Sequence, residues 1–92
     1  RIKIMSLKIS VELTFSPLIA DYEKPIKEFI KKLRSSGLTV KENPLSTQVY
    51  GDYDTVMNLV QAEMKSALEN VDSGLLFMKI VKTDRSDYEP NF

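Results

Sequence analysis

The sequence predicts an α+β fold in which four strands and two helices follow one another in the order βαββαβ. Apolar residues alternate with polar residues in several short stretches, and in two longer stretches they recur every three or four residues. The first spacing is typical of half-buried strands and the second of amphipathic helices. In this order, right-handed crossovers put both helices on one face of a four-stranded antiparallel sheet, which is the ferredoxin-like sandwich.

The first strand is the most regular element of the chain. Between residues 7 and 15, every odd position is apolar and every even position is polar. A period of two over this length predicts a strand with one buried face. The strand is expected to end at Ser16-Pro17, because proline cannot donate a hydrogen bond to a sheet ladder.

A helix is predicted between Asp21 and Gly37, where glycine suits a left-handed cap. Its apolar residues fall at i, i+3, i+4 and i+7 and form one stripe: Ile26, Phe29, Ile30 and Leu33. The basic residues of this segment are interpreted as its solvated face. Residues 38–42 and 45–50 then predict two short strands, and the turn at Asn43-Pro44 between them makes an antiparallel hairpin.

The second helix is predicted to begin at Asp52-Tyr53-Asp54, which offers N-cap side chains, and to end at Asp72-Ser73-Gly74. Its apolar stripe consists of Val56, Val60, Met64, Ala67, Leu68 and Val71. Residues 75–82 predict the fourth strand. We therefore expect a single domain over residues 6–85, with residues 1–5 and 86–92 as flexible ends or additions to the natural chain.

Composition excludes several kinds of site. The 92 residues include no Cys and no His, so disulfides, thiolate nucleophiles, imidazole bases and zinc sites built on these residues are excluded. Thirteen basic residues balance thirteen acidic ones, which gives no reason to expect strong attraction to nucleic acid or an anionic membrane. No apolar run approaches the ~20 residues of a membrane span. We expect a cytoplasmic, non-enzymatic protein with no catalytic residues, no metal site, no cofactor and no stable membrane insertion.

The sheet face without helices is the predicted functional surface. Alternation assigns to it polar residues of the first strand together with Ser46, Gln48 and Tyr50 of the third and Phe77, Lys79 and Val81 of the fourth. Such a face is too apolar for free exposure and too polar for a core, so we expect two sheets to stack on it in a homodimer or a dimer of dimers. Its polar side chains would then converge around a small-molecule cavity.

Four segments carry a resemblance to a known family: Val11-Glu-Leu-Thr-Phe-Ser-Pro-Leu18, the helix Pro25–Leu33, the run Asn43–Gly51 with its Ser46-Thr-Gln-Val-Tyr-Gly51 strand, and the ending Lys79–Arg85. Together they resemble the YkoF-like family, which binds thiamin and hydroxymethylpyrimidine. The resemblance covers nearly the whole chain. It implies a ferredoxin-like, cytoplasmic, non-enzymatic binder of thiamin or its pyrimidine that assembles by sheet stacking.

Thiamin combines a flat aminopyrimidine with a cationic thiazolium, and the predicted face offers groups for both. An amide such as Gln48 and hydroxyl groups satisfy the pyrimidine edge, Glu12 accepts from the amino group or offsets the cation, and Tyr50 or Phe77 stacks on a ring. Thr47 is expected to point toward the helices and is the weakest candidate. The candidate ligand-binding residues are Ser10, Glu12, Thr14, Ser46, Thr47, Gln48, Tyr50, Phe77 and Lys79.

Proteins with the same topology have other functions, and the sequence leaves one of these open and disfavours others. A regulatory module that binds amino acids or another protein stays open as the alternative. RNA-binding domains need aromatic residues on the bare faces of the first and third strands, where this chain offers only Tyr50. An acylphosphatase needs a phosphate-binding loop with arginine after the first strand, and residues 16–21 contain no Arg and no Gly. The acidic segment 84–89 lacks the glycine of a calcium loop and is interpreted as a solvated tail.

Overall fold

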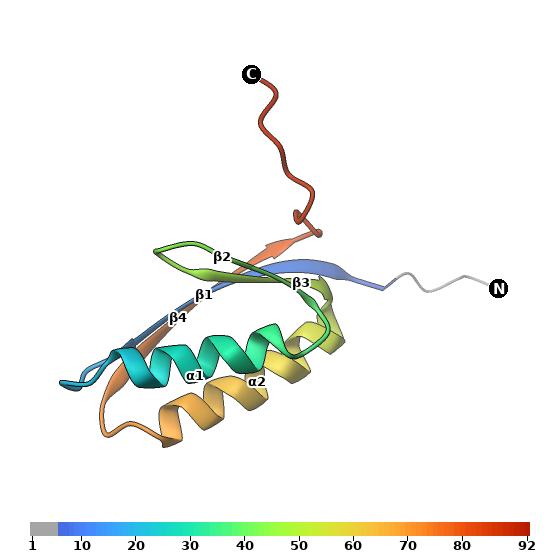
Figure 1. Cartoon of the computed structure of the whole chain (residues 1–92). Helices are drawn as coiled ribbons and strands as arrows, with labels where there is room; N and C mark the ends of the chain where they lie inside the picture. The colour runs from blue at the N-terminus through green and yellow to red at the C-terminus, as the bar shows by residue number, and fades with distance from the viewer. Residues whose placement is uncertain (1–5) are drawn as a thin grey trace.

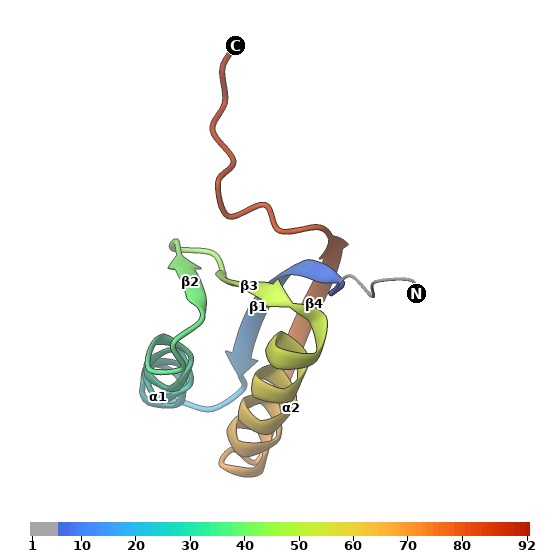
Figure 2. The same cartoon turned by 90° about the vertical axis from the view of Figure 1, so that its right-hand side faces the viewer.

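Six elements follow one another in the predicted order in the computed structural model, which describes residues 6–92. They are β1 (Lys8–Pro17), α1 (Glu23–Arg34), β2 (Thr39–Glu42), β3 (Thr47–Asp52), α2 (Tyr53–Glu69) and β4 (Gly74–Lys82) (Figure 1). The strands form one antiparallel sheet in the order β2-β3-β1-β4. Both helices lie on the same side of this sheet (Figure 2). The predicted ferredoxin-like fold is confirmed.

β1 extends two residues beyond its predicted end and includes Pro17, which pairs with Gly74. Pro17 can belong to the strand because its nitrogen is directed to a side where β1 has no partner strand at that position. In an antiparallel strand, successive residues direct their backbone groups to opposite neighbours. Lys8 accepts from Thr83 on the β4 side, so the odd-numbered residues of β1 face β3. The pairing with β3 ends at Leu13, and Pro17 therefore costs the sheet no hydrogen bond.

β3 begins two residues later than predicted because the preceding turn includes Leu45 and Ser46. The Asn43 side-chain oxygen accepts from the backbone N–H of Leu45 at 2.8 Å and of Ser46 at 2.9 Å, which is an Asx turn. At its other end, β3 continues through Gly51 and Asp52, since these residues still pair with β1. The hairpin turn itself lies where the sequence predicts it.

The helix ends confirm one capping prediction and correct another. Gly37, just beyond α1, has φ of +85°, which glycine adopts without the steric strain that a Cβ would bring. Asp52 occupies the N-cap position of α2, but its side chain makes no capping hydrogen bond. Its carboxylate instead pairs with Lys8 Nζ at 2.8 Å across the sheet. The ion pair with the neighbouring strand has replaced the predicted cap.

The core lies between the sheet and the helices, which pack mainly on the two central strands β1 and β3. Its buried residues come from the predicted apolar faces: Ile9, Val11, Leu13, Phe15, Phe29, Leu33, Val49, Val56, Val60 and Ala67. The rings of Phe15 and Phe29 meet at 5.5 Å with an interplanar angle of 60°. This packing leaves the opposite face of the sheet without a covering helix.

An ion pair between α1 and β2 makes stability depend on pH. Arg34 Nε lies 2.5 Å from Glu42 Oε2, and this contact lowers the Glu42 pKa from its ordinary value of 4.5. A carboxylate with a lower pKa in the folded state stabilises the fold above its unfolded pKa, and the contribution disappears as pH falls through the folded pKa.

We expect Glu42→Gln to flatten the loss of stability between about pH 5 and pH 3 by a small amount, since the pair is exposed. Urea unfolding at several pH values measures the effect. Arg34→Gln should flatten the profile in the same way, because it removes the other partner. Identical profiles for all three proteins would contradict the assignment.

Candidate functional site

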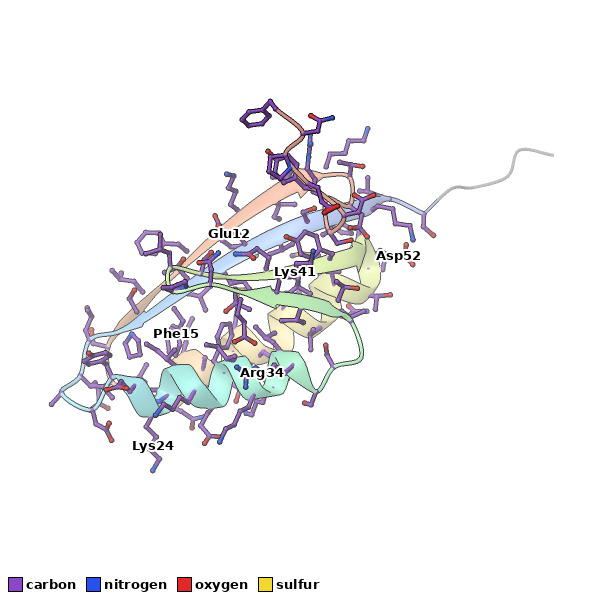
Figure 3. The ribbon with its side chains drawn as sticks, turned by 45° about the horizontal axis from the view of Figure 1, so that its top comes forward. Glu12, Phe15, Lys24, Arg34, Lys41 and Asp52 are labelled. Atoms are coloured by element: carbon purple, nitrogen blue, oxygen red, sulfur yellow. The ribbon has the colours of Figure 1, made fainter. Side chains whose placement is uncertain are left out.

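Cross-strand pairing brings the predicted polar residues together in rows on the open face of the sheet. Glu12 of β1 lies between Gln48 of β3 and Lys79 of β4. In the next row, Ser10 lies between Tyr50 and Val81, which confirms the predicted register of the fourth strand. Figure 3 shows Glu12 on this face and Phe15 between the sheet and the helices.

A shallow cavity of about 200 Å³ is centred on these two rows. It is lined by Ser10, Val11, Glu12, Gln48, Tyr50, Lys79, Val81 and Arg85. Five of these are candidate residues from the sequence. The lining combines an aromatic ring, an apolar patch and several hydrogen-bonding groups, which is the composition expected of a small-molecule site.

A chain of side-chain hydrogen bonds orients the carboxylate at the centre of the cavity. Gln48 Nε2 donates to Ser46 Oγ at 2.7 Å, and Ser46 Oγ donates to Glu12 Oε2 at 2.9 Å. Glu12 Oε1 accepts no hydrogen bond from another side chain within residues 6–92. The carboxylate is therefore held through one oxygen, and the other remains available to a donor.

The segment that follows β4 forms one wall of the cavity. Thr83 has φ of +90°, which a β-branched residue rarely adopts, and it turns the chain across the sheet. Ser10 Oγ donates to the Thr83 carbonyl at 2.8 Å and accepts from the Arg85 N–H at 2.9 Å. Lys41 of β2 donates to the Ser86 carbonyl. Figure 2 shows this segment leaving β4 and passing over the sheet toward β2.

Sequence reasoning missed Arg85, because residues 84–89 have no period and are interpreted from sequence as a solvated tail. The signal that could have found it is Ser10, which is only 8% exposed on an otherwise open face. A buried hydroxyl needs hydrogen-bond partners, and the chain just after β4 is the segment that the topology brings beside it.

Charges of both signs surround the cavity. Burial, with Asp84 and Glu12 nearby, raises the pKa of Tyr50, so its phenol remains a neutral donor at physiological pH. Hydrogen bonds from Ser86 lower the pKa of Asp84 and keep it ionised. Lys41 Nζ lies 6.0 Å from the centre of the Tyr50 ring. A ligand here would meet one face of an aromatic ring, a carboxylate and several cations.

The remaining candidates lie outside the cavity. Thr14 donates to the Leu45 carbonyl at 3.3 Å, one row beyond Glu12. Phe77 pairs with Thr14 across the sheet and is 60% exposed. Thr47 is 5% exposed and faces the helices, as its register predicts. Ser46 contributes through its contacts with Glu12 and Gln48.

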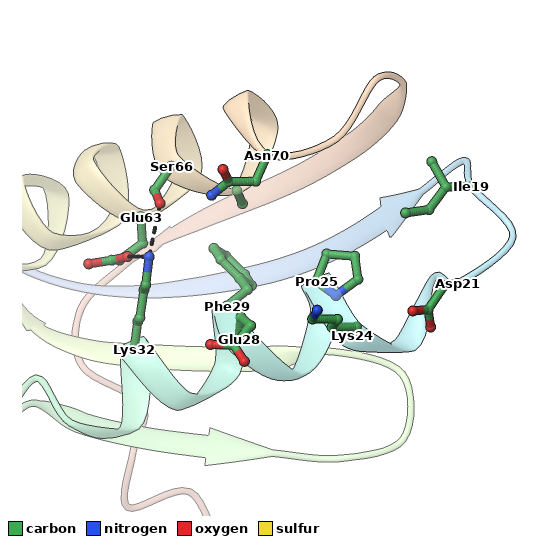
Figure 4. Close-up of a pocket in the computed structure, with 11 residues that line it drawn as sticks. Ile19, Asp21, Lys24, Pro25, Glu28, Phe29, Lys32, Glu63, Ser66 and Asn70 are labelled. Carbon is green, nitrogen blue, oxygen red and sulfur yellow. Dashed lines mark hydrogen bonds and ion pairs between the residues drawn. The ribbon is translucent and has the colours of Figure 1, made fainter.

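A larger groove of about 400 Å³ lies on the opposite side of the molecule, between α1 and α2 (Figure 4). None of the sequence candidates lines it. Of the two lysines that line it, Lys32 is already engaged, because Nζ lies 2.9 Å from Ser66 Oγ and 3.9 Å from Glu63 Oε1. The smaller cavity on the sheet is the better candidate, since one carboxylate oxygen of Glu12 there accepts no hydrogen bond from another side chain of residues 6–92.

Residues 6–92 offer neither a metal-binding cluster nor a membrane-spanning helix. No group of three or more His, Cys, Asp or Glu side chains in this part of the chain is arranged to hold a metal ion. Neither helix described there has the length and apolar character needed to cross a membrane.

Solved structures share this fold. A protein from Streptococcus pneumoniae is 25% identical, with a TM-score of 0.76 over 80% of this chain and 84% of its own. A protein from Methanocaldococcus jannascii is 27% identical, with a TM-score of 0.70 over 89% and 84%. A Thermotoga maritima protein assigned to thiamine biosynthesis or salvage is 23% identical, with a TM-score of 0.72 over 79% and 81%.

A curated relative and a protein family also match the sequence. The relative is a lysine–tRNA ligase from Psychromonas ingrahamii, 32% identical in an alignment of 72 residues that covers 73% of this chain. The match covers 14% of the ligase, so the likeness concerns a small part of that enzyme. The family, described as thiamine-binding protein, matches residues 11–91, which include every element but the first residues of β1. The chain belongs to the thiamine-binding protein family.

Proposed function

We propose that this protein binds thiamin or its hydroxymethylpyrimidine part in the cavity on the open sheet face and releases it unchanged. It would serve storage, delivery or sensing of the vitamin in the cytoplasm. The observation that carries the proposal is the oriented Glu12 carboxylate beside Gln48 and Tyr50, in a member of the thiamine-binding protein family.

The chemistry of the cavity suits an aminopyrimidine. Glu12 Oε1 would accept from the exocyclic amino group, and the Tyr50 hydroxyl would donate to a ring nitrogen. The Tyr50 ring offers a stacking surface. For thiamin itself, the Glu12 charge would also offset the thiazolium. Charge-assisted hydrogen bonds contribute about 1.5–3 kcal/mol each, so a few of them give micromolar affinity.

A second copy of the chain is the proposed cover of the cavity. The cavity opens away from the sheet, on the side where no helix lies. Stacking two such faces about a two-fold axis would enclose the ligand and bury the exposed Phe77. The ligand would then lie between two sheets in a dimer or a dimer of dimers.

Calorimetric titration with thiamin and with hydroxymethylpyrimidine tests the proposal. We expect saturable binding of at least one of them at micromolar concentration. Absence of heat at millimolar ligand would contradict the proposal. Thermal stabilisation by amino acids, but not by thiamin or its pyrimidine, would instead select the alternative of an amino-acid-binding regulatory module.

Two variants of Tyr50 separate the contribution of its ring to ligand binding from that of its hydroxyl. We expect Tyr50→Leu to weaken binding about three- to tenfold, in line with the ~0.5–1.5 kcal/mol of an aromatic pair. Tyr50→Phe keeps the ring and should lose less. Tyr53→Leu, at the start of α2, is a matched control outside the cavity. Equal affinities for the Leu and Phe variants of Tyr50 would exclude stacking as its role.

A further inference from the structure

The lining of the cavity on the open sheet face carries more positive than negative charge. It includes two cations, Lys79 and Arg85, and one carboxylate, Glu12. Within residues 6–92, neither of these cations forms a salt bridge, so both charges remain free to act on a ligand. Lys79 lies beside Glu12 across the sheet. Arg85 therefore leaves the lining with one excess positive charge.

Arg85 belongs to a segment of the chain that is fixed over the sheet at two points. Beside β1, its backbone N–H donates to Ser10 Oγ at 2.9 Å. Beside β2, Lys41 donates to the carbonyl of Ser86, the next residue. The Asp84 carboxylate accepts from the Ser86 N–H at 2.9 Å, which makes an Asx turn around Arg85. The backbone of Arg85 is thus held on both sides, and the residue lines the cavity.

Ser10 uses its hydroxyl to hold this segment. The side chain is buried, and its Oγ donates to the Thr83 carbonyl at 2.8 Å while it accepts from the Arg85 N–H. A hydroxyl carries one proton, so Ser10 has none left to donate to a ligand. Thr83 has φ of +90°, and such a conformation persists only where the surrounding structure fixes it. The contact with Ser10 therefore helps to keep Arg85 at the cavity.

Building on the proposed function, we infer that Arg85 is a specificity-determining residue of the cavity and that Ser10 is a positioning residue that acts through it. Hydroxymethylpyrimidine carries no permanent charge, whereas thiamin carries the thiazolium cation. Because like charges repel, Arg85 weakens the binding of thiamin more than that of the pyrimidine. The charge of the segment after β4 thus favours a neutral aminopyrimidine over a cationic one.

Calorimetric titration of Arg85→Gln with both ligands tests this role at about pH 8, where lysine and arginine side chains keep their charge. At an effective dielectric constant of about 40–80, removal of a like charge about 6 Å away raises affinity roughly three- to tenfold. We therefore expect thiamin to bind Arg85→Gln about three- to tenfold more tightly than the wild type, and hydroxymethylpyrimidine to change much less.

Two controls show whether the charge at this position is responsible. Arg85→Lys keeps the charge and should keep the wild-type ratio of the two affinities. Lys27→Gln removes a positive charge from α1, on the other side of the sheet, and should keep this ratio as well.

Ser10→Ala tests the positioning role through the same ratio of affinities. Partial unfolding would weaken the binding of both ligands equally, whereas displacement of Arg85 changes the ratio. We expect Ser10→Ala to shift the ratio in the same direction as Arg85→Gln. The double variant should have the ratio of Arg85→Gln alone, since Ser10 acts through Arg85. Arg85 is exposed, so its variants decide the outcome even if Ser10→Ala does not fold.

The possible results separate this inference from the proposed function. Equal changes of the two affinities in Arg85→Gln, or no change in either, would overturn the inference and leave the proposed function standing. A wild-type ratio in Ser10→Ala, or additive shifts in the double variant, would overturn the role of Ser10. Absence of binding of both ligands to the wild type would overturn the proposed function and the inference together.

Discussion

Replacement of Glu12 by glutamine is expected to weaken thiamin binding by at least tenfold. The glutamine side chain has nearly the same shape but carries no charge to offset the thiazolium. Its amide group also brings N–H donors to a position where the ligand presents its own amino group. Loss of one charge-assisted hydrogen bond costs about 1.5–3 kcal/mol, which corresponds to roughly ten- to 150-fold in affinity. Calorimetric titration of both proteins measures the change.

Two controls distinguish a lost contact with the ligand from a folding defect and from a general effect of charge. Glu12 lies on the open face outside the core, so Glu12→Gln should keep the unfolding midpoint of the wild type. Glu69→Gln, at the end of α2 and far from the cavity, removes the same charge and should leave affinity unchanged. Equal affinity for wild type and Glu12→Gln would remove Glu12 from the site. A matching loss in Glu69→Gln would point to a long-range charge effect.

Replacement of Leu33 by alanine is expected to lower the free energy of unfolding by about 2–5 kcal/mol, as for other buried leucines. Leu33 is fully buried where α1 packs against the sheet. For 92 residues, the whole stability is roughly 5–14 kcal/mol, so this one change removes a large part of it. Urea unfolding followed by circular dichroism measures the difference.

Leu45→Ala is the matched control, because Leu45 is 84% exposed in a turn. Its effect should stay within about 0.5 kcal/mol. Similar losses at the two positions would show that α1 does not pack against the sheet through Leu33. An unfolded Leu33→Ala variant would mean that the domain depends on this contact even more strongly than is usual for a buried leucine.

The faces of the strands could be predicted from the sequence because side chains alternate strictly along a strand. The odd residues of β1 form the core, and the even ones Ser10 and Glu12 reach the cavity. In β4, the register follows the same alternation, although apolar residues occupy both faces. An exposed edge strand and a strand buried on both faces can show the same apolar pattern. The pattern alone therefore could not tell which of the two β4 is.

Local competition between hydrogen-bond partners could not be predicted in the same way. Asn43 holds Leu45 and Ser46 in the turn and so delays the start of β3. Asp52 pairs with Lys8 instead of capping α2, because the sheet register places the lysine beside it. Both outcomes depend on contacts that exist only after the chain has folded.

The wall of the cavity, formed by the segment after β4, could not be predicted from hydrophobic periodicity for a similar reason. Thr83 adopts a positive φ and directs the chain over the sheet, where Arg85 meets Ser10. Nothing in the spacing of residues 83–86 marks this path. The buried Ser10 hydroxyl is the feature that requires it, and its burial is known only once the sheet is assembled.

Amide chemical shifts recorded during a thiamin titration test the central claim most directly, because they locate the ligand on the molecule. We predict that the largest shifts cluster on the open face, at Ser10, Glu12, Gln48, Tyr50, Lys79 and Arg85. Shifts confined to the groove between α1 and α2, around Phe29 and Ser66, would contradict this claim. A spectrum unchanged by millimolar thiamin and hydroxymethylpyrimidine would contradict it as well.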